Sequence, residues 1–179
     1  DGGDGADIRS IAFTGKRCID NTIFLCPDGH QVCKLNPTGF QWFDLSIDDP
    51  DYVIAEVKKA EKILIKYIEQ IKENYNIDNS QIILAGFSQG CMMSINLGLI
   101  CSQSFRSVIG FSGKIIDKED LQKRIISNTD MLLFHGDADE VGPPSNLLEA
   151  KDFLERNKLK VEANMIKNCS HHIPIEALS

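Results

Sequence analysis

The chain has 179 residues, of which 42% are hydrophobic and 25% charged, as in an ordinary soluble globular protein with one substantial core. Its formal net charge of −7 disfavours sequence-independent binding to nucleic acid or anionic lipid, and no transmembrane run, signal peptide or lipidation motif is visible. The 6 cysteines form no C-x-x-C pair, and a chain of this size needs no disulfides, so we expect reduced thiols and a cytoplasmic location.

The first third of the chain opens on a glycine-rich turn and predicts a short helix at residues 7–14. An apolar run at 22–25, closed by a Pro-Asp-Gly turn, predicts a buried strand. A loop rich in proline, glycine and aromatic residues follows at 36–43. With no repeat, low-complexity tract or linker in the chain, we expect residues 1–179 to form a single domain.

The clearest predicted helix begins near Pro50. Asp48 and Asp49 can cap its start, and proline fits a first helical turn. Apolar residues then keep a helical spacing from Val53 to Tyr75, while lysines and glutamates occupy the opposite face. This pattern indicates a packing face and a solvated face.

From residue 82 onward, short apolar strands alternate with helices. We expect strands at 82–85, 108–111, 131–134 and 161–165, and helices at 89–100, 118–124 and 144–156. This alternation predicts an α/β fold, with a mostly parallel sheet, helices on both faces and the last strand nearer the edge. In such sheets ligands bind at the carboxyl ends of the strands.

One strand end carries the segment Gly86-Phe87-Ser88-Gln89-Gly90, followed by a predicted helix. This is the G-x-S-x-G nucleophile elbow in its strand–turn–helix setting, in which Ser88 takes a strained backbone conformation. The pattern alone occurs by chance in roughly one chain in twenty at average composition, and it is then a plain glycine-containing turn. The flanking strand and helix favour the interpretation of Ser88 as a nucleophile.

A serine hydroxyl needs an imidazole to remove its proton and a carboxylate to orient that imidazole. Two further strand ends supply candidates, Asp137 and Asp139 after one strand and His171 and His172 after the next. Taken singly, each of these could be an ordinary loop residue, and His135 could be a buried histidine bonded to backbone. A metal site is disfavoured because adjacent histidine side chains diverge and no H-x-x-x-H or H-x-H spacing exists.

More specific segments are D-G-x-D at residues 4–7, N-P-x-G-x-Q-W-F at 36–43 and G-F-S-Q-G at 86–90. With these segments the chain resembles, nearly from end to end, the phospholipase/carboxylesterase family of α/β-hydrolases, which includes the acyl-protein thioesterases. The resemblance implies an α/β-hydrolase fold, an ester or thioester hydrolase and no cofactor.

The resemblance also selects among the candidate acids and bases. The family's H-G-x-x-D-x-x-V-P motif matches residues 135–143 and implies that Asp139 is the acid; its G-x-x-H motif implies that His171 is the base. Gly142 stands where the family has valine, which we expect to loosen this loop. Asn168 stands where the family has glycine, so we expect a change in the loop that carries the base.

By resemblance, the acyl group is transferred to Ser88, and water activated at His171 then hydrolyses the acyl-enzyme. The implied oxyanion donors are the backbone N–H groups of Gln89 and Asp1. Trp42, Phe43 and Phe87 either line an acyl pocket or are simple packing residues.

The segment before Asp1 that the family places in the middle of the sheet is missing from the sequence. We therefore expect a fragment that lacks the N-terminal strands of the domain, with unpaired strands beside the gap. One hypothesis is a working hydrolase of small-molecule or lipid acyl esters, or of acylated protein. The alternative is a catalytically impaired remnant with only a binding or vestigial role, since losing one oxyanion donor costs about 2.7–4 kcal/mol of barrier. Acyl length, ester or thioester preference and oligomeric state stay open.

Overall fold

The computed structural model describes residues 21–34 and 36–174. The predicted helix at 7–14, the D-G-x-D segment and Asp1 lie outside these residues. The chain forms two compact units, one of residues 1–60 with 174–179 and one of residues 61–173.

The unit of residues 1–60 contains a small antiparallel sheet of β1 (Gln31–Val32) and β2 (Phe40–Gln41). β2 lies inside the N-P-x-G-x-Q-W-F segment, which the sequence predicted only as a loop. Two-residue strands are too short for an alternation of apolar and polar residues to indicate them. Phe43, just after β2, is fully buried.

The strand predicted at residues 22–25 does not form, and this prediction was wrong. A strand requires a hydrogen-bonding neighbour, and this segment pairs with none of the described strands. Its apolar side chains are instead exposed, with 64% for Ile23 and 40% for Leu25. The segment is apolar, but an apolar segment forms a buried strand only where a neighbouring strand pairs with it.

Helix α2 (Pro50–Tyr75) confirms the predicted helix and crosses the division between the two units. Asp49 caps its start, because its Oδ1 accepts from the backbone N–H of Asp51 at 3.0 Å and of Tyr52 at 3.3 Å. Four residues of the predicted apolar face are buried, namely Val57, Ala60, Leu64 and Ile68, whereas Tyr75 at the end is 46% exposed. No helix among residues 21–34 and 36–174 is both long and apolar enough to cross a membrane.

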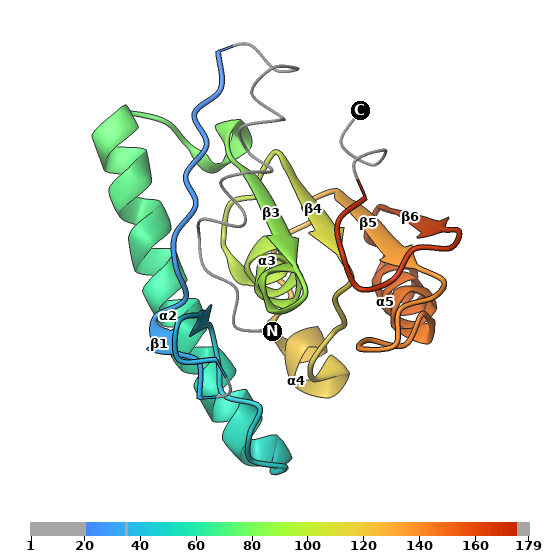
Figure 1. The fold of residues 1–179 in the computed structure, drawn as a ribbon. Helices are drawn as coiled ribbons and strands as arrows, with labels where there is room; N and C mark the ends of the chain where they lie inside the picture. The colour runs from blue at the N-terminus through green and yellow to red at the C-terminus, as the bar shows by residue number, and fades with distance from the viewer. Residues whose placement is uncertain (1–20, 35, 175–179) are drawn as a thin grey trace. The chain divides into compact units, whose positions relative to one another are not determined.

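The unit of residues 61–173 is built on a parallel sheet in the order β3-β4-β5-β6 (Figure 1). Its strands are β3 (Ile83–Phe87), β4 (Ser107–Phe111), β5 (Met131–Gly136) and β6 (Val161–Ile166). The connecting helices are α3 (Gln89–Ile100), α4 (Lys118–Arg124) and α5 (Ser145–Arg156), and the short 3-10 helix η1 (Asn79–Gln81) precedes β3. The predicted parallel sheet and the three helices predicted between its strands are confirmed, with β6 at an edge.

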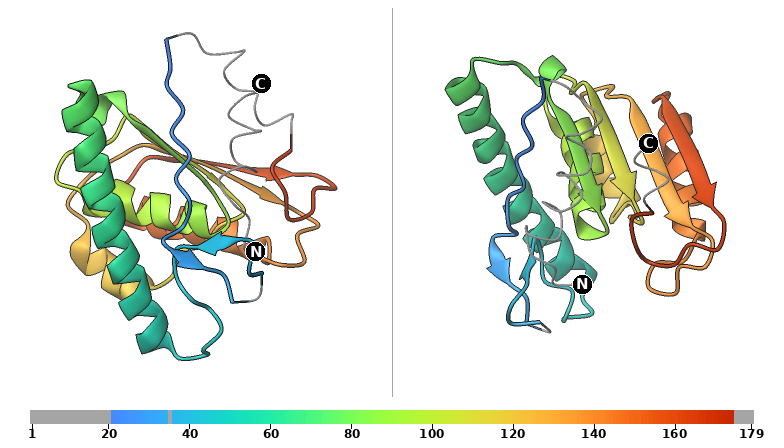
Figure 2. Two further views of the ribbon diagram at one scale, coloured as in Figure 1. Left: turned by 60° about the vertical axis from the view of Figure 1, so that its left-hand side comes forward. Right: turned by 45° about the horizontal axis from the view of Figure 1, so that its top comes forward.

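The main core lies between this sheet and its helices. α3 and α5 lie on the same face of the sheet (Figure 2), as right-handed crossovers in a single direction require. α3 is buried from Cys91 to Leu99 and packs on β3 and β4. On the opposite face of β3, Ile83 remains 50% exposed. Because all four strands are parallel, their carboxyl ends meet at one edge of the sheet.

Candidate active site

Ser88 lies at the sharp turn between β3 and α3. Its φ of 50° and ψ of −115° lie in a strained region of backbone conformation for an L-residue. Such a conformation persists only where surrounding contacts hold the backbone in place. The surrounding bonds are present: the Ser88 N–H donates to the Phe111 carbonyl at 2.9 Å, and its own carbonyl accepts from Met92 at 3.1 Å. This is the backbone conformation that the nucleophile elbow predicts.

Gly86 allows β3 and α3 to approach closely at this turn. A Cβ at Gly86 would overlap the backbone of Gly90 and Cys91, so no larger residue fits without a shift of the helix. A Cβ at Gly90, in contrast, would meet nothing within 4 Å among the described residues. A side chain is therefore excluded at Gly86 by the backbone of Gly90 and Cys91, whereas Gly90 itself has space for one.

Cys91, three residues after Ser88, is 2% exposed. Its sulfur occupies space that a side chain at Gly110 or Gly113 would need. Burial raises the pKa of the Cys91 thiol to about 12, although a hydrogen bond from the Gly113 backbone opposes the rise. Cys91 therefore stays a thiol at neutral pH and is no nucleophile beside Ser88.

Asp139 lies in the loop after β5 and is 5% exposed. Its Oδ1 accepts from the backbone N–H of Val141 at 2.9 Å and of Gly142 at 2.8 Å, and its Oδ2 lies 2.7 Å from His171 Nδ1. Burial raises the pKa of Asp139, but the Gly142 N–H, the hydrogen bond and charge of His171 and the Val141 N–H together hold it below its ordinary value. The carboxylate is thus ionised and oriented.

His171 follows β6 and contacts Phe87 of β3 as well as Asp139. Its ring lies against the ring of Phe87, with 4.7 Å between the centroids and 48° between the planes. Phe87 is the last residue of β3 and directly precedes Ser88. The imidazole therefore lies between the loop that carries Asp139 and the turn that carries Ser88.

The alternative acid and base have other contacts. Asp137 accepts the backbone N–H of Asn168 at 2.7 Å through its Oδ1, as a loop carboxylate does. His172 is exposed, and its Nδ1 lies 3.0 Å from Ser170 Oγ. Of the four candidates, the structure brings together Asp139 and His171.

His135 is the buried histidine bonded to backbone that the sequence allowed, with Nε2 2.9 Å from the Gly142 carbonyl.

The loops after β5 and β6 are joined by backbone hydrogen bonds. Asp137 N–H donates to the Ile166 carbonyl at 3.0 Å, and Ala138 N–H donates to the Cys169 carbonyl at 3.1 Å. Asn168 has a φ of 55°, the left-handed conformation in which glycine is favoured and asparagine is the best tolerated alternative. The expected change in this loop is therefore small, because asparagine keeps the backbone that glycine would adopt.

Gly142 is likewise held in place. Its N–H donates to Asp139 and its carbonyl lies at hydrogen-bond distance from His135. A Cβ there would be 3.6 Å from Asn146 Nδ2 and 3.8 Å from Asp139 Oδ2, which are ordinary contacts. The backbone bonds thus restrain the loop that the missing valine was expected to loosen.

The remaining predicted residues are distributed as follows. Gln89 is the first residue of α3, and Asp1 lies outside the described residues. Trp42 and Phe43 belong to the unit of residues 1–60, whereas Phe87 belongs to the unit that carries Ser88. The roles of all of these in oxyanion or substrate binding stay predictions.

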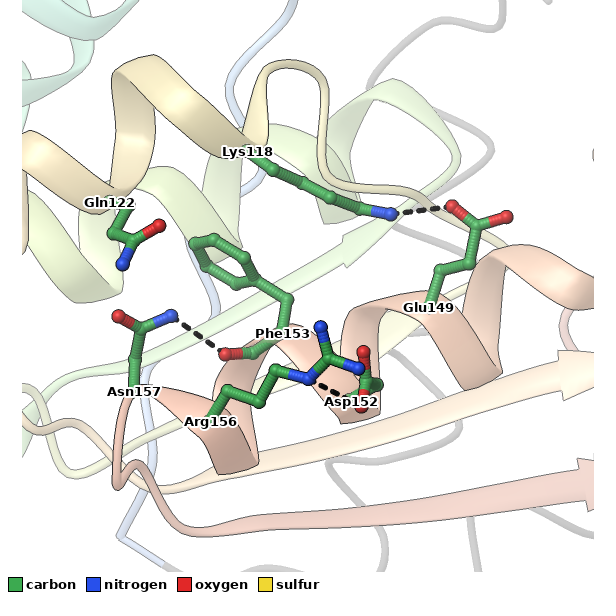
Figure 3. A pocket seen from close by; sticks show the side chains of 7 residues that line it. All are labelled: Lys118, Gln122, Glu149, Asp152, Phe153, Arg156 and Asn157. Carbon is green, nitrogen blue, oxygen red and sulfur yellow. Dashed lines mark hydrogen bonds and ion pairs between the residues drawn. The ribbon is translucent and has the colours of Figure 1, made fainter.

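A separate hollow of about 390 Å³ lies between α4 and α5 (Figure 3). Its charged side chains form ion pairs, Lys118 with Glu149 at 2.6 Å and Arg156 with Asp152 at 3.0 Å. The other lining residues are Gln122, Phe153 and Asn157. It shares no residue with the cluster around Asp139 and His171, so it is not the site of the chemistry considered above.

Known proteins similar to this chain indicate its family and fold. The profile of the family described as Phospholipase/Carboxylesterase matches residues 2–179. The solved structure of esterase PE8 is 30% identical with a TM-score of 0.93, covering 99% of this chain and 83% of that one. Arabidopsis thaliana SOBER1, 19% identical with a TM-score of 0.80, covers 99% of this chain and 89% of that one and shows the same fold.

Two acyl-protein thioesterases are similar in sequence. That of Gibberella zeae is 28% identical over 159 residues, and that of Yarrowia lipolytica is 24% identical over 151 residues. The alignments cover 80% and 77% of this chain but 63% and 64% of those proteins, so the chain spans less than two thirds of their length. With the family profile matched along almost the whole sequence, the chain has the α/β-hydrolase fold and belongs to the phospholipase/carboxylesterase family.

Proposed function

We propose that this protein is a serine hydrolase of carboxylic esters or thioesters, in which Ser88 is the nucleophile, His171 the general base and Asp139 the orienting acid. One observation carries the proposal. His171 Nδ1 lies 2.7 Å from the buried carboxylate of Asp139, while the same ring lies against Phe87, the neighbour of Ser88. An oriented imidazole beside a strained serine is the arrangement that acyl transfer requires.

In the first step the Ser88 oxygen bonds to the acyl carbon, and its proton passes to His171 Nε2. The tetrahedral intermediate then expels the alcohol or thiol, which takes that proton, and the acyl-enzyme remains. Water next attacks the acyl carbon, gives a proton to the same nitrogen and releases the acid as Ser88 regains its hydrogen. Asp139 accepts a hydrogen bond from Nδ1 throughout and stabilises the transient imidazolium.

The oxyanion needs backbone donors. The N–H of Gln89, at the start of α3, is one proposed donor, since the turn at Ser88 aims the helix start toward the reacting carbonyl. The second proposed donor, the N–H of Asp1, lies outside the described residues.

The substrate class is proposed from the relatives. Because the matched proteins from Gibberella zeae and Yarrowia lipolytica are acyl-protein thioesterases, acylated proteins and lipid acyl esters are the substrates we propose to test first. No cofactor is part of the proposed reaction.

The test is covalent labelling with a fluorophosphonate probe. We expect the folded wild-type chain to become labelled at Ser88, as located by peptide mass spectrometry, and the folded Ser88→Ala variant to remain unlabelled. Parallel assays with p-nitrophenyl esters and acyl thioesters then compare the two leaving groups. A folded wild-type chain that neither reacts with the probe nor hydrolyses these substrates would instead support the impaired remnant with a binding or vestigial role.

A further inference from the structure

His135 is a buried titratable residue that the proposed chemistry does not use. It lies near the carboxyl end of β5, and its side chain is 1% exposed. A fully buried imidazole is costly unless its polar atoms are bonded, so its partners indicate why it is kept there. Its Nε2 lies 2.9 Å from the Gly142 carbonyl oxygen and 3.2 Å from Asp139 Oδ2.

These two partners determine which ring nitrogen carries hydrogen. A carbonyl oxygen can only accept a hydrogen bond, so the contact with Gly142 assigns a hydrogen to Nε2. The same N–H is close enough to Asp139 to place the positive end of its dipole beside the carboxylate. His135 therefore acts on Asp139 both through the loop backbone and across space.

The backbone route runs through Gly142. His135 holds the carbonyl of Gly142, and the N–H of Gly142 donates to Asp139 Oδ1 at 2.8 Å. The other oxygen of that carboxylate lies 2.7 Å from His171 Nδ1. Restraining Gly142 from one side therefore restrains the direction in which the carboxylate faces the base.

We propose that His135 is a positioning residue for the acid: its Nε2–H, bonded to Gly142 and beside Asp139, holds the carboxylate in line with His171. This role rests on the proposed function only in that the base it serves is His171. A histidine that merely filled the core would be replaceable by an apolar residue of similar size, whereas a positioning histidine requires the donor at Nε2.

Two variants separate these roles. His135→Leu fills the buried site without any donor, and His135→Gln can place an amide N–H near the position of Nε2. Thr129→Val is the matched control for lost stability, because Thr129 is 1% exposed and accepts the Phe105 N–H at 3.0 Å away from the reacting residues. Thermal unfolding is measured for all of them.

The first readout is the fluorophosphonate labelling rate of Ser88 together with kcat and KM for an ester. We expect His135→Leu to lower the labelling rate and kcat about tenfold to a hundredfold, the effect of losing one hydrogen bond to a charged group, with KM little changed. His135→Gln should recover most of this loss, and Thr129→Val should label as the wild type does. Wild-type labelling by a folded His135→Leu variant, or equal losses in the leucine and glutamine variants, would overturn the proposal.

The second readout does not need activity. In protein labelled with 15N-histidine, the Nδ1–H signal of His171 is assigned by its loss in His171→Ala and followed by hydrogen exchange. We expect exchange to quicken about tenfold or more in His135→Leu and to stay near the wild-type rate in His135→Gln. If the wild type is folded but inert and this difference persists, the hydrolase proposal fails while the positioning role stands; unchanged exchange in His135→Leu refutes the positioning role.

Discussion

At the scale of a single side chain, the contacts of Asp139 allow a specific prediction about kcat. Replacing it with asparagine keeps its size but removes the charge that would stabilise the imidazolium of His171 and can favour the wrong tautomer. We expect Asp139→Asn to lower kcat by about 10⁴. The measurement is the steady-state hydrolysis of an activated ester by the purified wild-type protein and the purified Asp139→Asn variant.

Asp137→Asn is the matched control, since Asp137 lies in the same loop and bonds the Asn168 N–H rather than a histidine. An asparagine side chain still has an oxygen that accepts this bond, so activity should stay within about threefold of wild type, which corresponds to less than about 1 kcal/mol of barrier. A loss in Asp137→Asn as large as that in Asp139→Asn would show that the acid has been assigned to the wrong residue.

Gly136, the last residue of β5, and Gly142, in the loop after it, should respond to alanine in opposite directions. At Gly142 a Cβ meets only ordinary contacts, so Gly142→Ala should raise the free energy of unfolding by about 0.4–1 kcal/mol, because the unfolded chain loses freedom. At Gly136 a Cβ would overlap the carbonyl of Cys169, so Gly136→Ala should destabilise the fold. Urea denaturation measures both, and equal effects of the two substitutions would contradict this account.

The choice between neighbouring loop residues is the part of the site that residue patterns alone left open. Asp137 and Asp139, like His171 and His172, follow the right strands, but side chains in loops have no periodicity that tells which one points inward. The family motifs selected one of each pair. The contact of His135 with Gly142 could not be predicted at all, because it depends on how the loop between them closes.

At the scale of helices and strands, α3 and α4 begin and end at the predicted residues, and the four parallel strands lie within two residues of their predicted bounds. Their apolar runs are flanked by clear turns and caps, so local signals suffice. The run at 22–25 has an equally apolar sequence but no described strand beside it. Whether an apolar run becomes a strand therefore depends on a partner that no local pattern contains.

Glu61 of α2 links three helices of the unit of residues 61–173. Its buried carboxylate accepts from Asn96 Nδ2 of α3 at 2.9 Å and from both Arg124 amino groups of α4 at 2.8 and 3.2 Å. We expect Glu61→Ala to lower the free energy of unfolding by about 3 kcal/mol, because it leaves the guanidinium and the amide without their acceptor. Chemical denaturation checks this value.

The exposed pair of Lys118 and Glu149, between α4 and α5, is the matched control. Both side chains are about half exposed, so Lys118→Ala should cost less than about 1 kcal/mol. Replacing Glu61 and Arg124 together by leucine should cost less than Glu61→Ala, because no buried charge is then left alone. A double substitution that is worse than the single one would argue against the network.

At the scale of the whole molecule, α2 is common to both compact units, since its 26 residues cross the division at residue 60. The sequence predicted a single domain because no linker interrupts the chain. A helix shared by two units is consistent with that absence of a linker. Trp42, the only tryptophan, lies in the unit of residues 1–60 and its fluorescence can therefore report on that unit.

Acid should destabilise both units. In one, the hydrogen bond from Lys34 and those from Ser46 hold the pKa of Asp44 well below its ordinary value, and in the other the pKa of Asp139 is also lowered. A carboxyl group whose pKa is lower in the folded state contributes stability above its unfolded pKa and loses it as pH falls through the folded value. With an ordinary value of 3.8 for both groups, stability should change little from pH 7 to about 5 and decline steadily below about 4.

Urea titrations between pH 7 and 3 test this, with Trp42 fluorescence following one unit and amide hydrogen exchange of β5 and β6 following the other. We expect the free energy of unfolding from both probes to fall in the acid range. Asp139→Asn should flatten the decline seen at β5 and β6, because its amide does not titrate, and it should leave the acid dependence contributed by Asp44 in place. Stability that rises from pH 5 to 3 would mean that the carboxylates are better accommodated as neutral acids, contrary to their hydrogen bonds from Lys34 and His171.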